Sequence, residues 1–191
     1  MTHPVPIDAA VPGDALILPD GGAFLVRPIT PASKSLIAGA MRRLSAESIR
    51  RRFFAPRREL SDLELHRLTA LDGWNQYALG ACARGPDGTL EGVGVARFAR
   101  LDEDRRTAEI AVTVVDAYQS RGIGSALLAR LIAVATTRGI RRLQALSLPD
   151  NAPVQRLLRR FAPAARWRDE GDYLAMEFAL AAEPVSMIAL A

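Results

Sequence analysis

Cysteine and histidine are nearly absent from this sequence, which has one cysteine, Cys82, and two histidines, His3 and His66. A single thiol excludes an internal disulfide framework and any zinc site built from several thiolates. So few soft ligands also argue against a transition-metal site, and a Ser-His-Asp hydrolase would depend on His66. We therefore expect no metal site and no histidine-based hydrolase.

Lysine is equally scarce, because Lys34 is the sole lysine and the net charge of +4 comes almost wholly from arginine. This balance favours anionic partners in general, such as a phosphate-rich cofactor, an acidic protein or nucleic acid. Aromatic residues do not alternate with the arginine clusters, which argues against nucleic acid. We interpret the clusters at 50–52 and 57–58 as a solvated helix face. The alternative is a site for an acidic substrate or a cofactor phosphate.

Long hydrophobic runs are missing as well, since no stretch of about eighteen apolar residues occurs. Residues 1–12 have neither the basic segment nor the apolar core of a signal peptide. We therefore expect a cytoplasmic protein without a membrane segment. The composition, 49% hydrophobic and 24% charged, is that of a globular chain, and the length of 191 residues predicts one domain.

Turn and cap residues divide the chain into an N-terminal extension at 1–22, a domain at 23–180 and a C-terminal tail at 181–191. Four prolines and a Gly-Gly pair make the extension look like an arm or loops, so the fold is expected to begin near Ala23. Ser45, the Ser61–Glu64 capping box, and Asp150 or Asn151 are predicted helix N-caps. The predicted order is a strand at 23–29, helices at 31–44, 46–54 and 62–71, strands at 77–84, 91–100 and 107–115, a helix at 122–138, a strand at 141–148, a helix ending at 161, and two short strands within 166–180. This order predicts an α/β domain with a mixed sheet.

A glycine-containing loop at 119–124 lies between a predicted strand and a long amphipathic helix. Gly122 and Gly124 lack a Cβ, so backbone N–H groups at the helix start can approach a bulky anion, which the helix dipole also favours. Arg121 offers a charged partner, and Gln119 can fix the loop or donate to the anion directly. The pattern suits a pyrophosphate. It matches neither the dinucleotide-binding glycine fingerprint nor a P-loop.

Residues 112–128, Val-x-Val-x-x-x-Tyr-Gln-x-Arg-Gly-x-Gly-x-x-Leu-Leu, resemble motif A of the GCN5-related acetyltransferases, the GNAT superfamily. Val26-Arg27-Pro28 is similar to the family's opening, and Asp150-Asn151 to its second motif, so the resemblance covers 23–178. It implies a GNAT-type mixed, mostly antiparallel sheet flanked by helices. Acetyl-CoA would be the cosubstrate and no metal would be needed. The residues that it implies for cofactor binding are Val112, Val114, Gln119, Arg121, Gly122, Ile123, Gly124, Ser125 and Asn151.

A narrower likeness links residues 44–54, 66–69 and 108–112 to the catalytic domains of protein lysine acetyltransferases. It implies a primary amine as acceptor and makes a protein lysine side chain a candidate. Those domains occur fused to acyl-CoA-synthetase-like or cyclic-nucleotide-binding modules, and we recognise neither module in this sequence. The acceptor, the acyl chain preference and the oligomeric state, a homodimer included, are left open.

Glu109 is the candidate base, because an amine with a reference pKa of about 10.4 must lose a proton before it can attack a thioester. The resemblance places the subgroup's catalytic glutamate here. Strand alternation puts Glu109, Ala111 and Thr113 on one face, with Val112 and Val114 on the other. The alternative is a surface glutamate that pairs with a neighbouring arginine, Arg105 or Arg106.

Val114 matches the position whose backbone N–H stabilises the oxyanion in this family. Many relatives also use a tyrosine of the last helix to protonate the leaving thiolate, and residues 155–159 contain none. The thiolate would then leave unassisted or through water, unless Tyr173 or Tyr118 substitutes; we expect Tyr118 to be a packing residue. The predicted function is direct transfer of an acetyl group from acetyl-CoA to a primary amine. The alternative is a non-catalytic acyl-CoA-sensing or interaction domain.

Overall fold

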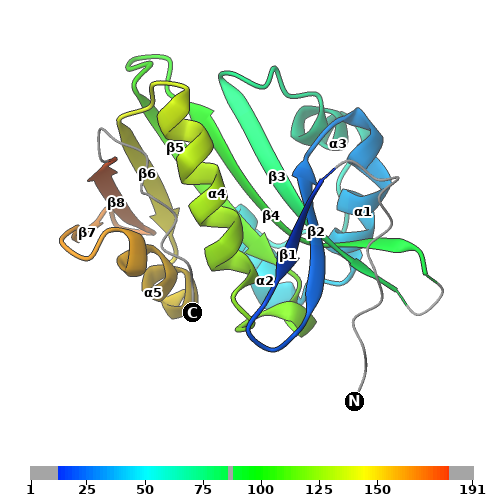
Figure 1. Ribbon diagram of the computed structural model, residues 1–191. Coiled ribbons are helices and arrows are strands. Elements are labelled where there is room, and N and C mark those ends of the chain that lie inside the picture. The colour runs from blue at the N-terminus through cyan, green and yellow to red at the C-terminus, as the bar shows by residue number, and fades with distance from the viewer. Residues whose placement is uncertain (1–12, 86–87, 181–191) are drawn as a thin grey trace.

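A single mixed sheet organises the chain in the computed structural model, which describes residues 13–85 and 88–180 (Figure 1). The strands follow the order β1-β2-β3-β4-β5-β6-β8-β7. All neighbouring strands are antiparallel except the parallel pair β5 and β6. This confirms the predicted mixed, mostly antiparallel sheet. The strands are β1 Asp14–Ile17, β2 Ala23–Pro28, β3 Gln76–Arg84, β4 Leu90–Arg100, β5 Thr107–Val114, β6 Arg142–Ser147, β7 Trp167–Asp169 and β8 Leu174–Ala179.

The helices begin close to the predicted cap residues. They are α1 Lys34–Arg42, α2 Ala46–Phe53, α3 Asp62–Thr69, α4 Ile123–Thr137 and α5 Ala152–Phe161, with 3-10 turns η1 Pro31–Ser33 and η2 Asp116–Tyr118. The Ser45 hydroxyl caps α2 and a Ser61–Glu64 capping box opens α3, as predicted. The helix expected from Pro31 instead starts as the 3-10 turn η1, and α1 begins at Lys34. None of the described helices is long and apolar enough to cross a membrane.

Helices cover both faces of the sheet. Helix α4 crosses the front of the sheet in Figure 1 and packs on β3, β4 and β5, with Leu127 and Leu131 fully buried. Helix α2 lies behind the sheet and packs on β5, while α1 packs on β4. Two glycines of β4 show the two faces, because a Cβ on Gly94 would meet Leu127 of α4 and one on Gly92 would meet the backbone of Leu36 in α1. The main core lies between α4 and the sheet.

The N-terminal boundary differs from the prediction. Residues Asp14–Ile17 form β1, which pairs with β2 through a turn closed by the Leu18 and Gly22 backbones at 2.9 Å. Leu16 and Leu18 are buried in the core. The domain therefore begins by Asp14 and not, as expected, near Ala23. The sequence did not reveal β1 because a four-residue edge strand is too short to give a clear alternation of apolar and polar residues. Residues 1–12 and 181–191 of the predicted extension and tail lie outside the described residues.

Strands β5 and β6 separate halfway along their length. Their parallel register joins Thr107 with Arg142 and ends where Glu109 meets Gln144, whereas β5 continues to Val114 and β6 to Ser147. Beyond Glu109, β5 pairs with β4 only. The sheet therefore opens at the carboxyl ends of β5 and β6, next to the start of α4.

Candidate active site

A cleft of about 640 Å³ occupies the place where β5 and β6 separate. Its volume is in the range that holds a cofactor-sized molecule. Strand β5, the loop before α4, helix α5 and helix α2 all contribute to its walls. Glu109 and all but one of the predicted cofactor residues line it, namely Val112, Val114, Gln119, Gly122, Ile123, Gly124, Ser125 and Asn151.

The two faces of β5 give the cleft two chemically different sides. A Cβ built on Gly124 would lie 3.7 Å from Val114 Cγ2 and 3.9 Å from Val112 Cγ2, so these valines face α4. Alternation puts Glu109 and Thr113 on the opposite face, on which α2 packs. The separation of β5 from β6 joins the two sides of the cleft. A group bound against α4 can therefore reach a group bound beside α2.

The backbone of Val114 faces the open edge of β5. The N–H of Val115 donates to the Val93 carbonyl of β4 at 2.9 Å. Because consecutive N–H groups of a strand point to opposite sides, the Val114 N–H points away from β4, toward the gap left by β6. The Val114 carbonyl shares this side and accepts a hydrogen bond from Gln119 Nε2 at 3.0 Å. The edge of β5 thus presents a backbone donor inside the cleft.

The loop before α4 is shaped by two residues in the left-handed region, Ser120 with φ 61° and Gly122 with φ 94°. Gly122 occupies the N-cap position of α4, and no side chain caps the helix, in contrast to α2, α3 and α5. The first N–H groups of α4 have no partner within the helix, and the positive end of its dipole adds to them. This helix start lines the cleft and can bind an anion without a cation or a metal.

A hydrogen-bond network joins the segment before α4 to helix α2. The Asp116 carboxylate accepts from the Ser45 backbone N–H at 2.8 Å, the Ser45 hydroxyl at 2.7 Å and the Ser48 hydroxyl at 2.8 Å. Gln119 Nε2 adds a bond to Ser48 Oγ at 3.2 Å, so Gln119 fixes the loop as expected. Ser45 and Asp116 are far apart in sequence, and nothing in the motif pointed to this link.

Asp116→Ala is expected to destabilise the protein by about 1 kcal/mol, since it removes several solvent-accessible hydrogen bonds. Burial raises the pKa of Asp116, but the hydrogen bonds from Ser45 and Ser48 outweigh it and hold the pKa below the ordinary 3.8. A lowered folded-state pKa means that the stabilisation is complete above 3.8 and is lost as the pH falls through the folded value. Urea unfolding of both proteins at neutral and at acid pH measures this. Asp102→Ala, at a side chain 98% exposed, is the control, and an equal loss in the two variants would contradict the prediction.

Arg121 is the predicted cofactor residue that does not line the cleft. Its Nε donates to Asp20 Oδ2 at 2.8 Å, in the turn between β1 and β2, and its guanidinium stacks over Phe24 at 5.3 Å from the ring centroid. The bond from Arg121 lowers the pKa of the Asp20 carboxyl. In this arrangement the Arg121 side chain links the loop before α4 to the turn between β1 and β2. This link was not predicted because residues 13–22 were assigned to an N-terminal extension outside the domain.

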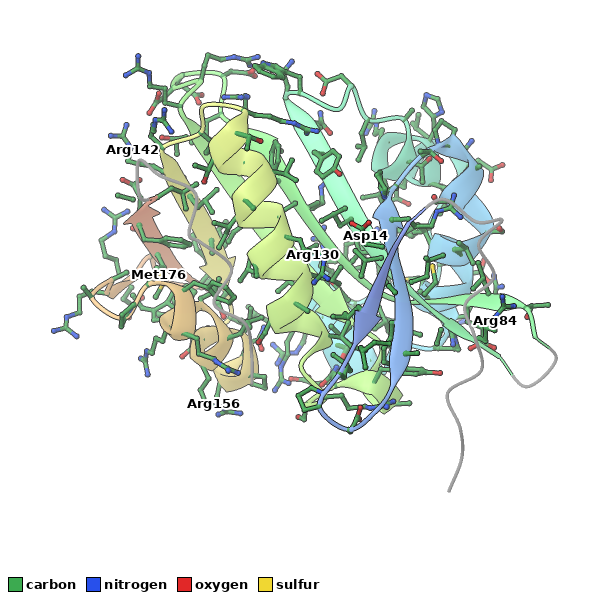
Figure 2. All side chains as sticks on the ribbon, viewed as in Figure 1. Asp14, Arg84, Arg130, Arg142, Arg156 and Met176 are labelled. Atoms are coloured by element: carbon green, nitrogen blue, oxygen red, sulfur yellow. The ribbon has the colours of Figure 1, made fainter. Side chains whose placement is uncertain are left out.

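Four arginines line the cleft, two from each flanking helix, namely Arg51 and Arg52 of α2 and Arg156 and Arg160 of α5. Figure 2 shows Arg156 at the lower edge of the molecule, at α5. The interpretation of residues 50–52 as a solvated face is therefore wrong for Arg51 and Arg52. The arginines of α5 were not singled out, although they follow Asn151 on a basic helix and that proximity was a usable signal.

Glu109 is the one acidic side chain among the residues that line the cleft in the described chain. No ion pair joins it to Arg105 or Arg106 there; Arg105 instead contacts Asp102 and the Asn75 side chain. The cations whose charges act on Glu109 are Arg52 of α2 and Arg97 of β4. The carboxylate is exposed to the cleft and can accept a proton from a molecule bound there.

The two tyrosines considered at the sequence level lie in different places. Tyr118 lines the cleft and packs edge-on against Phe24, with ring centroids 6.0 Å apart, so it is a packing residue as expected. Tyr173 follows the turn between β7 and β8, is 39% exposed and is not among the lining residues. Of the two, Tyr118 is the tyrosine that a molecule in the cleft would meet.

The fold and the cleft together define a class of protein. A central sheet that opens between two parallel strands, beside an uncapped helix start, matches the resemblance drawn from motif A. Residues 46–162 match the family model described as the acetyltransferase (GNAT) family. The chain belongs to this family.

Individual relatives agree with this assignment. Over 151 residues the chain is 32% identical to an acetyltransferase of Pseudomonas aeruginosa, a match that covers 78% of this chain and 80% of the relative. It is also 32% identical over 140 residues to the acetyltransferase Pat of Mycolicibacterium smegmatis, which covers 73% of this chain but 41% of Pat. The crystal structure of the GNAT domain of S. lividans PAT aligns with a TM-score of 0.78 and 33% identity, covering 88% of this chain and 97% of that domain. The chain is thus a GNAT protein similar to the Pat acetyltransferases.

Proposed function

We propose that this protein transfers the acetyl group of acetyl-CoA directly to a primary amine. The observation that carries the proposal is the arrangement around β5. One face of the strand meets an uncapped helix start, and its open edge presents the Val114 N–H. Its other face carries Glu109, the one carboxylate among the described residues that line the cleft. An acyl donor on one side and an amine on the other would meet at the gap between β5 and β6.

Acetyl-CoA would bind through its phosphates at one end and its pantetheine arm at the other. The pyrophosphate is assigned to the N–H groups at the start of α4, around Gly122 and Gly124. The amide-containing arm is assigned to the open edge of β5, at Val112 and Val114, near Asn151. Arg156 and Arg160 of α5 supply positive charge on the same side of the cleft. None of these contacts requires a metal.

In the proposed reaction the amine nitrogen attacks the thioester carbonyl, and the carbonyl oxygen becomes an oxyanion. Glu109 takes the proton from the amine, directly or through water. The Val114 N–H donates to the oxyanion, as a fixed dipole aimed at the developing charge. Collapse of the intermediate forms the amide and releases the CoA thiolate, which takes a proton from water. The acceptor class to test first is a protein lysine side chain, because residues 44–54, 66–69 and 108–112 resemble protein lysine acetyltransferases.

The test has two stages on one sample. Acetyl-CoA is expected to raise the melting temperature, by an amount equivalent to about 2.7 kcal/mol when its concentration is a hundred times Kd. Release of free CoA thiol is then followed with a panel of amines and lysine-containing proteins. No stabilisation at any concentration would overturn the proposal.

The second candidate, a domain that senses acyl-CoA without catalysis, is favoured by the absence of a tyrosine in residues 155–159 of α5. It predicts stabilisation by acetyl-CoA without thiol release across the whole panel. Acetyl transfer to any member of the panel would exclude it.

A further inference from the structure

Arg52 differs from the other arginines of its helix because it forms no ion pair with any residue that the structure describes. Arg50 bonds Glu47 and Asp150, and Arg51 pairs with Glu47 at 2.8 Å. Arg52, in contrast, makes no hydrogen bond and no ion pair within the described chain; its recorded side-chain contact is the ring of Phe53, at 5.1 Å from the centroid. A half-buried guanidinium has five donors to satisfy, and Arg52 lines the cleft.

The surroundings of Arg52 concentrate positive charge. The pKa of the Arg52 guanidinium is lowered to about 10, chiefly by burial and also by repulsion from Arg97 and Arg57, against the attraction of Glu109. Both neighbouring arginines have partners of their own, since Arg97 donates to Gln76 at 3.1 Å and Arg57 pairs with Glu64 at 2.6 Å. Among the described residues, Glu109 is the one carboxylate that lines the cleft, and it faces the positive charges of both Arg52 and Arg97. A charge buried without a partner is costly, so this side of the cleft favours an anion.

This positive charge lies on the acceptor side of the strand. Arg97 pairs in register with Ala111, which puts it on the same face of the sheet as Glu109. The pyrophosphate is assigned to the start of α4 on the opposite face, with Arg156 and Arg160 of α5 beside it. The cofactor phosphates therefore have donors of their own. Arg52 is therefore available to bind the acceptor, the molecule that carries the amine.

We propose that Arg52 binds an anionic group on the acceptor, so that the substrates of this enzyme are amines carrying a carboxylate or similar anion close to the reacting nitrogen. The proposal rests on the proposed acetyl transfer and names its substrate class. Arg52 and Glu109 would hold the two ends of one acceptor, the anion on the guanidinium and the amine at the carboxylate. The anion could belong to a small amino acid or to an acidic residue beside a protein lysine, which present the same chemistry to Arg52.

Two matched pairs of probes distinguish a small amino acid from an acidic residue beside a protein lysine as the source of the anion. The first pair is Nα-acetyl-lysine and Nα-acetyl-lysine amide, which share the side-chain amine and differ in one carboxylate. The second pair is two peptides in which the residue before the lysine is aspartate or asparagine. Each probe is assayed for kcat/KM with acetyl-CoA and, separately, for its equilibrium Kd on the protein saturated with CoA.

The wild-type protein is expected to prefer the anionic member of at least one pair by about tenfold, the scale of one charge-assisted hydrogen bond. Arg52→Gln should reduce this preference to less than about twofold, and Arg52→Lys should keep part of it. Arg58→Gln, which removes an exposed charge near the same helix, should leave the preference unchanged. Preference in the first pair alone identifies a small carboxylate substrate, and in the second pair alone an acidic segment around a lysine.

Equal affinity for both members of each pair in the wild type, or a preference that survives in Arg52→Gln, would overturn the proposal. An Arg52 that served only as counter-charge to Glu109 would lower kcat for every probe alike and shift the pH profile without changing the preference. If the proposed acetyl transfer itself were wrong, no probe would be acetylated. The Kd values of the matched probes would still show whether Arg52 binds their anionic group.

Discussion

Glu109→Gln is expected to lower kcat for acetyl transfer by about two to four orders of magnitude while the Kd for acetyl-CoA stays unchanged. Glutamine has nearly the same shape but cannot take a proton from the amine. Glu109 is the one carboxylate among the described residues that line the cleft, so no neighbouring side chain there replaces it. Its face of β5 is opposite to that of Val112 and Val114, which separates the base from the proposed cofactor contacts.

The measurement is steady-state transfer over a range of pH, together with calorimetric binding of acetyl-CoA. In the variant, kcat/KM should keep rising with pH, because the acceptor amine, with a reference pKa of about 10.4, must then lose its proton to water. Glu103→Gln is the control, since Glu103 is an exposed carboxylate in the loop before β5. Unchanged turnover in Glu109→Gln would remove Glu109 from the role of base.

Gly124→Val is expected to weaken acetyl-CoA binding more than about a hundredfold, which corresponds to about 2.7 kcal/mol. A Cβ at Gly124 would already lie 3.4 Å from Leu157 Cδ2 of α5 and 3.7 Å from Val114 Cγ2 of β5. The two methyl groups of valine would then enter the space between α4, α5 and β5, where the pantetheine arm is assigned. They would also keep the pyrophosphate away from the N–H groups at the start of α4.

This loss should occur without unfolding, because valine has a somewhat higher helix propensity than glycine and the added Cβ makes only ordinary van der Waals contacts. Circular dichroism and thermal melting of the free protein check the fold, and calorimetry gives the Kd. Gly39→Val applies the same change in α1, where the one neighbour within 4 Å is the end of the Arg42 side chain, and it should bind acetyl-CoA normally. An unaltered Kd in Gly124→Val would place the cofactor elsewhere.

Local sequence signals were enough for the features that depend on a few adjacent residues. Ser45 and the Ser61–Glu64 box begin helices because their side chains bond backbone groups three residues away. Gly122 marks the loop before α4 because its φ of 94° is one that glycine adopts without strain. The alternation along residues 107–115 correctly separated Val112 and Val114 from Glu109.

Long-range partners escaped prediction for an equally physical reason. The link from Asp116 to Ser45 joins residues that only the packing of α2 on β5 brings together. The turn carrying Asp20 reaches Arg121 because β1 pairs with β2 at the edge of the sheet. Strand β1 is too short for its pattern to be recognised in the sequence. Arg51 and Arg52 looked like part of a solvated helix face, since a helix's own sequence does not say what lies opposite it.

The sequence by itself determined the family, the mixed sheet and the place of the glycine-containing loop before α4, because motif A, the caps and the strand periodicity are encoded within short stretches of chain. Only the tertiary structure decided that β5 and β6 separate beyond Glu109, so that the Val114 N–H faces a gap instead of a neighbouring strand. It also decided which arginines form ion pairs: Arg50 and Arg51 do, whereas Arg52 forms none within the described chain, although the charge of Glu109 attracts it. Charge balance depends on distances between distant segments, and those distances are set only when the chain packs.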